Sequence, residues 1–286
     1  MLKLGISGQA LGDTMSFDQI VDIGKKYGAL DFELWPVNAV GSGSGYDGRD
    51  VDAVERTVKE KGIRICCVTY NDAFDEEIVK QRDVYVNGLC SAIRTAARLG
   101  APCVNHYCYY IARERLDFDR MEQYWEKPLL LAEQLGVRLA LENEAHDATG
   151  TPQGMRKVLD HFDSPWFLTN LDATNYFHAS CEGFPMAYDL LKDKIGYVHL
   201  KNACLYREGL PAHNTGAPMS GHYAPMPIQY ASIEDGCVNI AGLLSRLQND
   251  GLYNGACTLE PHTQPQYVEP FYACETSALR KLGFFK

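Results

Sequence analysis

The chain has 286 residues, of which 46% are hydrophobic and 22% are charged, and its formal net charge is −10. This composition is typical of a folded protein with a large core and argues against disorder. The negative charge, together with the lack of any Lys/Arg cluster, argues against nucleic acid as a partner.

The sequence predicts neither a membrane span nor a signal peptide. The apolar stretch at residues 1–6 is interrupted at once by Ser7-Gly8-Gln9, and no run reaches 18 apolar residues. The 10 cysteines are scattered within apolar runs without a Cys-x-x-Cys pair, so we expect buried reduced thiols. A cytoplasmic protein is therefore expected.

Eight short apolar runs alternate with longer amphipathic stretches along the chain. Nearly continuous apolar runs are typical of strands that are covered on both faces. The alternation predicts a single (β/α)8 barrel over residues 1–286, slightly longer than the roughly 250 residues usual for this fold. The predicted strands are residues 2–7, 30–35, 64–70, 103–107, 138–143, 167–172, 196–200 and 256–260.

The amphipathic stretches are predicted to be the outer helices of the barrel. One begins after a Ser16 cap and places Phe17, Ile20 and Val21 on one face. A long helix is predicted over residues 75–99, because Gly100 and a following proline are a normal helix stop. Residues 240–247 also repeat apolar side chains at helical spacing.

Residues 205–235 interrupt this rhythm. The segment is rich in Pro, Gly, Met, Tyr and His, and it shows no helical or strand period. It follows the seventh strand, at the end of a barrel where active sites lie. We therefore predict a long active-site loop that covers the mouth, the alternative being a surface insertion without a role. Its candidate contact residues are His213, His222, Tyr223 and Tyr230.

The last four predicted strands each end in a side chain that can bind a metal. The residues are Glu142, Asp172, His199 and Glu260. Because the carboxyl ends of barrel strands converge on one mouth, these side chains can meet although they are far apart in sequence. Three carboxylates and one imidazole suit Mn²⁺, Mg²⁺ or Co²⁺ and also admit Zn²⁺. We expect a divalent metal, Mn²⁺ first, whereas any one of these residues alone would more often be an ordinary polar group at a strand end.

A second set of residues near the strand ends could act on a substrate. His106 could bind a substrate hydroxyl or pack as a structural histidine. His146 could serve as an acid/base or lie in a cap or on the surface, and Trp35 could stack on a sugar or pack at the rim. Lys201 could stabilise a developing oxyanion or form a salt bridge to a ligand carboxylate.

The sequence resembles the xylose isomerase-like TIM barrel superfamily, which includes sugar isomerases, ketose 3-epimerases, inosose dehydratases and the endonuclease IV branch. The resemblance spans nearly the whole chain in strand order. It implies that the four strand-end residues bind one catalytic metal, and that Glu142 and Glu260 exchange the substrate proton. The segments that carry it are Leu141-Glu142-Asn143, Leu171-Asp172, His199-Leu200-Lys201 and Leu259-Glu260-Pro261-His262.

Two positions depart from the pattern of the superfamily. Asn202 stands where many relatives have aspartate, which predicts altered surroundings of the metal. The epimerases carry a histidine soon after the strand-six aspartate, and His178 follows Asp172 at a greater distance. We expect His178 to contact the substrate if it fills that role.

The resemblance implies a divalent-metal-dependent sugar isomerase or epimerase that removes a proton next to a metal-bound carbonyl. The alternative is a metal-dependent lyase on a 3-oxo sugar, as in inosose dehydration or in C-glycoside cleavage by barrels with a small partner subunit. His146 and the long loop favour that lyase. A nuclease would need more histidines and a basic groove, and a non-enzymatic sugar-binding barrel is a further alternative. The substrate is expected to be a small sugar or sugar derivative, and association into a homo-oligomer or with a small subunit stays open.

Overall fold

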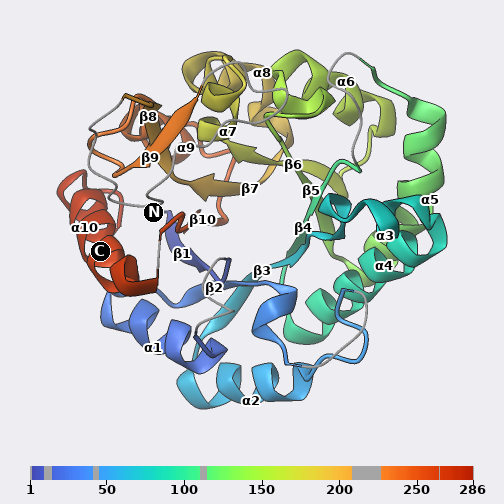
Figure 1. The fold of residues 1–286 in the computed structure, drawn as a ribbon, viewed down its shortest axis with the longest axis horizontal. Coiled ribbons are helices and arrows are strands. Elements are labelled where there is room, and N and C mark those ends of the chain that lie inside the picture. Colours follow the sequence, from blue (N-terminus) through green and yellow to red (C-terminus); the bar gives the residue numbers. More distant parts are fainter. Residues whose placement is uncertain are drawn as a thin grey trace.

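Eight parallel strands form a closed barrel in the computed structural model, which describes residues 2–9, 15–40, 45–109, 115–207, 227–263 and 265–285 (Figure 1). The strand order is β1-β10-β7-β6-β5-β4-β3-β2, and β2 pairs with β1 to close the ring. The predicted (β/α)8 fold is thus confirmed, and each predicted strand agrees with the observed one to within one residue at either end. The barrel strands are β1 (Lys3–Ser7), β2 (Asp31–Leu34), β3 (Arg64–Tyr70), β4 (Cys103–Tyr107), β5 (Arg138–Glu142), β6 (Phe167–Asp172), β7 (Ile195–Leu200) and β10 (Ala256–Leu259).

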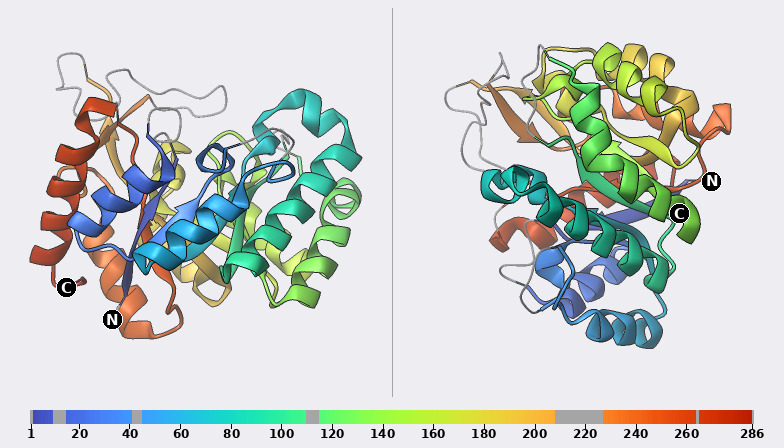
Figure 2. Two further views of the ribbon diagram at one scale, coloured as in Figure 1. Left: turned by 90° about the horizontal axis from the view of Figure 1, so that it is seen from below. Right: turned by 90° about the vertical axis from the view of Figure 1, so that its right-hand side faces the viewer.

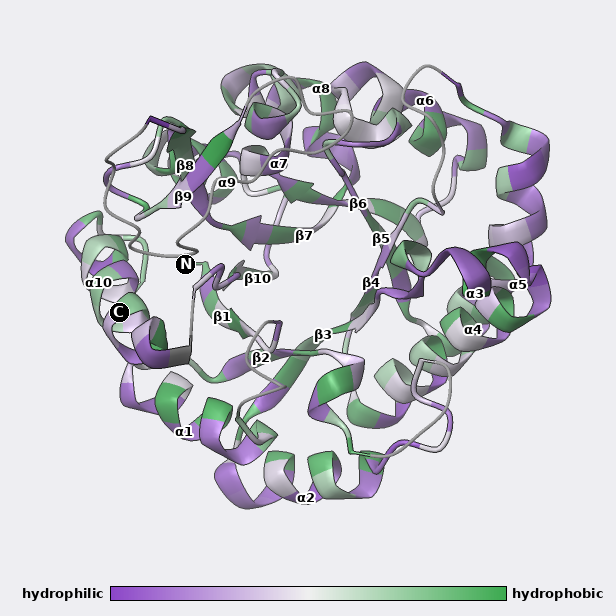
Figure 3. Cartoon of the chain, in the orientation of Figure 1, coloured by the Kyte–Doolittle hydropathy of each residue, from purple (hydrophilic) through white to green (hydrophobic). Residues whose placement is uncertain are grey.

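Helices surround the barrel, and hydrophobic and hydrophilic residues alternate along them, as amphipathic helices require (Figure 3). No helix in these described ranges is long and apolar enough to cross a bilayer. The start of β1 and the end of α10 lie at the same end of the barrel (Figure 2). The helices are α1 (Phe17–Lys26), α2 (Val51–Lys61), α3 (Glu76–Lys80), α4 (Arg82–Leu99), α5 (Phe118–Leu135), α6 (Pro152–Phe162), α7 (Ala173–His178), α8 (Tyr188–Leu191), α9 (Ile240–Asp250) and α10 (Val268–Lys281).

The first helix shows how the sequence sets these elements. The Ser16 side chain accepts a hydrogen bond from the Gln19 backbone N–H, and the Gln19 side chain accepts one from the Ser16 N–H. This capping box satisfies two donors that the first helical turn leaves free, so the predicted cap is confirmed. Phe17, Ile20 and Val21 are buried on the inner face of the helix.

The long helix predicted over residues 75–99 is wrong as a single element. The chain forms α3, leaves helical geometry at Gln81, and then forms α4. The Val79 carbonyl, which would accept from the Asp83 N–H in a continuous helix, accepts instead from the Tyr124 hydroxyl at 2.7 Å. A contact from α5, distant in sequence, therefore accompanies the break.

The segment after β7 also differs from the prediction. β8 (Asn202–Leu205) and β9 (Ile228–Ala231) form a two-stranded antiparallel sheet, in which Asn202 pairs with Ala231 and Leu205 with Ile228. The prediction that residues 205–235 contain no strand is thus wrong at both ends of the segment. His213, His222 and Tyr223 lie outside the described residues.

The outward side chains of the barrel strands make the main core with the helices. Val104, Leu141 and Leu200 are fully buried within it. A smaller cluster inside the barrel contains Cys66 and Cys103. All 10 cysteines are free thiols. Six of them are buried as predicted, whereas Cys181 and Cys204 are partly exposed and Cys237 and Cys274 are exposed.

A buried acid in α10 holds the chain that follows β9. Glu275 is 2% exposed, and its Oε2 accepts a hydrogen bond from the Ile233 N–H at 2.9 Å. Burial raises the pKa of this carboxyl from its usual 4.5 to about 7. A carboxyl whose pKa is higher in the folded chain than in the unfolded one binds protons more tightly when folded. Its contribution to stability therefore falls as the pH rises from about 4.5 to about 7.

We therefore expect Glu275→Gln to change the free energy of unfolding differently at the two pH values. Relative to the parent protein, the variant should be more stable at pH 8 than at pH 5 by about 1–3 kcal/mol. The glutamine oxygen can still accept from Ile233, so the hydrogen bond is kept while the buried charge is removed. Denaturant unfolding of both proteins at the two pH values measures the difference. An identical effect of the substitution at pH 5 and pH 8 would contradict the assignment.

Candidate metal centre

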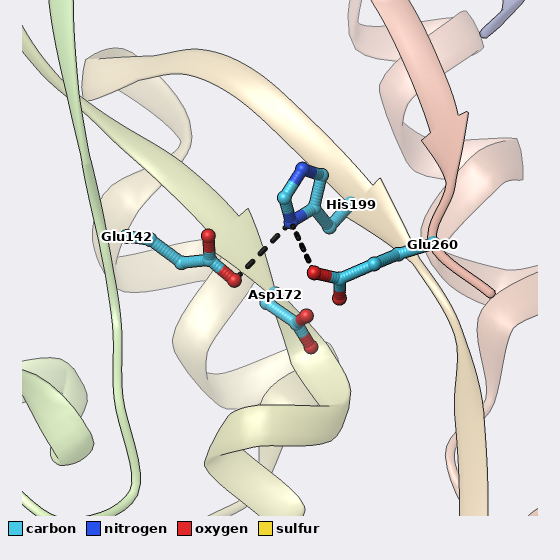
Figure 4. Close-up of side chains that lie close together, drawn as sticks. All are labelled: Glu142, Asp172, His199 and Glu260. Atoms are coloured by element: carbon cyan, nitrogen blue, oxygen red, sulfur yellow. Dashed lines mark hydrogen bonds and ion pairs between the residues drawn. The ribbon is translucent and has the colours of Figure 1, made fainter. Parts of the chain in front are cut away.

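The four residues predicted to bind a metal come together at the mouth of the barrel. Glu142, Asp172 and His199 lie at the ends of β5, β6 and β7, and Glu260 directly follows β10. Each is at most 2% exposed, and one ligand atom from each lies within 4.8 Å of the others. Figure 4 shows the carboxylates of Glu142 and Glu260 on either side of the His199 imidazole. His199 Nδ1 is 3.2 Å from Glu142 Oε1 and 3.7 Å from Glu260 Oε1.

Local hydrogen bonds orient the Asp172 carboxylate. Its Oδ1 accepts from the backbone N–H groups of Thr174 and Asn175, both at 2.8 Å, and so caps the start of α7. The Asp172 backbone N–H donates to Asn143 Oδ1, and Asn143 Nδ2 donates to the Asp172 carbonyl. These two hydrogen bonds link Asn143, which directly follows β5, to the end of β6 and fix the position of the residue that carries the ligand.

Three amide side chains orient the Glu142 carboxylate. Asn105 and Asn170 donate to its Oε2 at 2.9 and 3.2 Å. Asn175 donates to Oε1 at 3.3 Å, the oxygen that also faces His199. Neutral donors partly replace the water that this carboxylate loses on burial.

Glu33 at the end of β2 orients the imidazole of His199. Its carboxylate oxygens lie 3.1 and 3.2 Å from His199 Nε2, and Thr69 donates a further hydrogen bond to Glu33. A proton on Nε2 therefore points at Glu33, and Nδ1 faces the other three ligands. Burial opposes protonation of His199, but Glu142, Glu33 and Glu260 outweigh it and raise the pKa of the imidazole well above its usual value. Sequence analysis assigned no role to Glu33, although a glutamate inside an apolar strand was a usable signal.

Lys201 lies between two of the carboxylates. Its Nζ is 2.8 Å from Asp172 Oδ2 and 2.5 Å from Glu260 Oε2. Burial alone would lower the pKa of the ammonium, but the two carboxylates raise it well above its usual value. In turn Lys201 and His199 overcome the effect of burial and hold the pKa of Glu260 well below its usual range. Of the two roles predicted for Lys201, the structure shows the salt bridge to a ligand carboxylate.

Of the two roles predicted for His106, the structure contains the packed structural histidine and not the contact at the mouth. Its ring packs edge to face on Trp125 of α5 and on Phe167, with centroid distances of 5.4 and 5.7 Å. Neither ring nitrogen has a hydrogen-bond partner in the described chain, and burial lowers the pKa to about 3. His106 is paired in register with the core residue Leu141 and belongs to the layer between barrel and helices.

His146 lies beside the cluster without joining it. Its Nδ1 is 3.5 Å from Glu144 Oε2, and burial lowers the pKa of the imidazole. Burial and the nearby Glu142 raise the pKa of Glu144 well above its usual value. The sequence analysis did not single out Glu144, which directly follows the Glu142-Asn143 pair.

Trp35 and His178 occupy opposite sides of the mouth. The Trp35 indole donates to Ser7 Oγ at 3.0 Å and lies 6.4 Å from the Tyr107 ring. His178 on α7 is buried, and burial, Lys201 and His146 lower its pKa to about 4. Contact of either residue with a substrate stays a prediction.

Asn202 does not face the cluster, so the predicted change in the metal surroundings at this position is wrong. Its Nδ2 donates to the carbonyls of Ile233 and Val238, and its Oδ1 accepts from the Val238 N–H. The residue therefore secures the base of the segment after β9. In the same segment, Tyr230 stacks on His262 with a centroid distance of 4.0 Å, and His262 Nε2 is 3.3 Å from Glu260 Oε2.

The donor set fits a divalent cation. Three carboxylates and one imidazole nitrogen converge, the imidazole is oriented by Glu33, and amides or backbone groups hold two of the carboxylates. Such an oxygen-rich set suits hard or borderline divalent ions.

The model of the family described as xylose isomerase-like TIM barrel matches residues 18–278. The chain is also similar in fold to the IOLI protein with a bound zinc atom (12% identity, TM-score 0.70, covering 99% of this chain and 96% of that one). The fold is also similar to that of the 3-keto-D-glucoside 4-epimerase YcjR from E. coli (15% identity, TM-score 0.67, covering 99% of this chain and 99% of that one). It is similar as well to that of mannonate dehydratase from Streptococcus suis (14% identity, TM-score 0.69, covering 99% of this chain and 94% of that one). No curated protein sequence matches the chain.

We expect Glu33→Gln to weaken Mn²⁺ binding by roughly 10–100-fold, because the substitution removes the charge that orients His199 and makes it more basic. Titration calorimetry of the metal-free protein with Mn²⁺ measures the change. Glu275→Gln is the matched control, since it neutralises another buried carboxyl, in α10 rather than at the cluster, and should leave the affinity unaltered. Equal affinities of Glu33→Gln and the parent protein would contradict the role of Glu33.

Proposed function

The chain belongs to the xylose isomerase-like TIM barrel family, and we propose that it is a divalent-metal-dependent isomerase or epimerase of a small sugar or sugar derivative. The observation that carries this proposal is the placement of Glu142 and Glu260 on either side of the His199 imidazole. Two carboxylates on opposite sides of one site can each take or return a proton at the same carbon. Mn²⁺ is the preferred ion because three of the four ligands are carboxylates.

In this proposal, some residues of the site mainly bind the metal and others transfer protons. A divalent ion at the cluster would act as a Lewis acid that stabilises the negative charge developing on a substrate carbonyl. Glu260, kept ionised by Lys201 and His199, is suited to accept the proton from the adjacent carbon. Glu142, initially protonated, would return a proton from the other side, and Asp172 and His199 would mainly hold the ion. The amides on Glu142 fix its direction of approach.

A lyase acting on a 3-oxo sugar is the second candidate, and the Glu144–His146 pair favours it. Expulsion of a β-substituent requires a proton donor that is not tied to the ligands. His146 lies beside Glu144 at the mouth, outside the set of four. The cytoplasmic location and an assembly with further copies or a small subunit stay predictions from the sequence.

We expect solvent deuterium to enter the carbon next to the substrate carbonyl, and this exchange to require both metal and Glu260. A panel of ketoses and 3-oxo glycosides in D₂O with Mn²⁺, read by mass spectrometry, identifies the substrate. Glu260→Gln should slow exchange by at least about 10²-fold, the lower range of general acid–base effects. Glu269→Gln, an exposed site on α10, is the control. Full exchange by the chelated protein would overturn the proposal.

His146→Ala separates the two candidates. In an isomerase or epimerase Glu142 and Glu260 suffice for proton exchange, so we expect kcat to fall by less than about tenfold. A lyase that uses His146 as its acid would lose roughly 10²-fold or more. Metal content is measured in the same samples, so that lost metal is not mistaken for a lost acid. A metal-loaded but inactive His146→Ala variant of an epimerase would refute this division of roles.

A further inference from the structure

The two oxygens of the Glu260 carboxylate face different groups. Oε1 lies 3.7 Å from His199 Nδ1, on the side of the other metal-capable residues (Figure 4). Oε2 lies 2.5 Å from Lys201 Nζ and 3.3 Å from His262 Nε2. A carboxylate that is held through Oε2 in this way presents Oε1 to the cluster.

His262 reaches the Glu260 carboxylate because the chain turns back directly after β10. Only Pro261 separates the two residues, and a proline ring fixes its own backbone φ. His262 Nε2 is also 3.4 Å from Lys201 Nζ, so the imidazole contacts both members of the Lys201–Glu260 ion pair. A side chain placed in this way can orient a ligand carboxylate without itself binding the metal.

Tyr230 of β9 packs against the face of the His262 ring. The two rings are stacked, with a centroid distance of 4.0 Å and an interplanar angle of 13°. Tyr230 is 5% exposed and belongs to a small buried cluster with Ala203 and Ile228 of the β8–β9 sheet. Tyr230 pairs in register with Ala203, and β8 begins directly after Lys201. The sheet therefore holds the Tyr230 ring in place on one side of His262.

We propose that Tyr230 and His262 are positioning residues of the metal centre, and that Tyr230 acts only through His262. The inference rests on the proposed metal-dependent function, because it concerns how Glu260 is presented to the ion. Stacking on Tyr230 restricts the plane of the imidazole, and the imidazole nitrogen then holds Glu260 Oε2. The β8–β9 sheet thereby sets the direction of a ligand that follows β10.

Titration calorimetry of the metal-free protein with Mn²⁺ tests this proposal without substrate or turnover. His262→Phe keeps a ring and removes the nitrogen, so we expect it to weaken Mn²⁺ binding by roughly tenfold, the lower end for residues that orient metal ligands. Tyr230→Leu removes the stack and should weaken binding by about three- to tenfold, the range of one aromatic pair. Tyr230→Phe keeps the stack and should bind Mn²⁺ like the parent protein. Combined with His262→Phe, Tyr230→Leu should have no further effect.

A second stack of the same kind, on α5 and α6, provides the matched control. Phe118 stacks on His161 with a centroid distance of 4.3 Å, and His161 Nε2 is 2.9 Å from Glu122 Oε1. These three residues lie on the helices and not at the four strand ends that carry the ligands. His161→Phe should therefore leave the affinity for Mn²⁺ unaltered, and thermal unfolding of each variant shows whether it is folded.

Three results would overturn the proposal: parent-like Mn²⁺ affinity of folded His262→Phe, equal weakening by Tyr230→Phe and Tyr230→Leu, or additive effects of Tyr230→Leu and His262→Phe. A direct substrate contact by either residue, without a positioning role, would give the first result. The His262 side chain is 18% exposed, so His262→Phe decides the matter if Tyr230→Leu does not fold. A parent protein that binds no Mn²⁺ would instead overturn the proposed function, and this inference with it.

Discussion

The burial of four carboxyl groups in one small volume is the constraint on which the rest of the site depends. Glu33, Glu142, Asp172 and Glu260 are all removed from water at the mouth of the barrel. Removing a charged carboxylate from water costs several kcal/mol, and nearby carboxylates repel each other. The chain supplies two cationic groups, His199 and Lys201, and several amide donors against them. Fully ionised, the carboxylates retain a formal excess of negative charge, which a divalent cation would reduce.

The same constraint explains why the surrounding polar residues are arranged as they are. Asp172 uses Oδ1 to cap α7, whereas its buried Oδ2 has an ion pair with Lys201 but no hydrogen-bond partner among the described residues. Glu33 completes the set by accepting from the far nitrogen of His199, which fixes the direction of the ring. A parallel barrel makes this possible, because strand ends that are distant in sequence converge on one mouth.

The sequence predicted most of the barrel because its strands are apolar and regularly spaced, and it predicted the four ligands because the last four strands end in them. It could not tell which of two neighbouring side chains turns inward. In β4, Tyr107 pairs with Glu142 and faces the mouth, whereas His106 pairs with Leu141 and faces Trp125. The polarity of the side chains suggested that the histidine faces the mouth. Strand register decides which side chain does so, and register is not visible in a single sequence. The break at Gln81 likewise accompanies a contact from α5 that no local pattern contains.

All of these features follow if Glu142, Asp172, His199 and Glu260 together bind one divalent ion. The most direct measurement is anomalous diffraction at the manganese edge from crystals grown with Mn²⁺. We expect one strong anomalous peak between Glu142, Asp172, His199 and Glu260, roughly 2.0–2.6 Å from the ligand atoms as for oxygen- and nitrogen-bound divalent ions. A fully occupied crystal with its peak elsewhere, or with the four side chains still bonded only to one another and to Lys201, would contradict it.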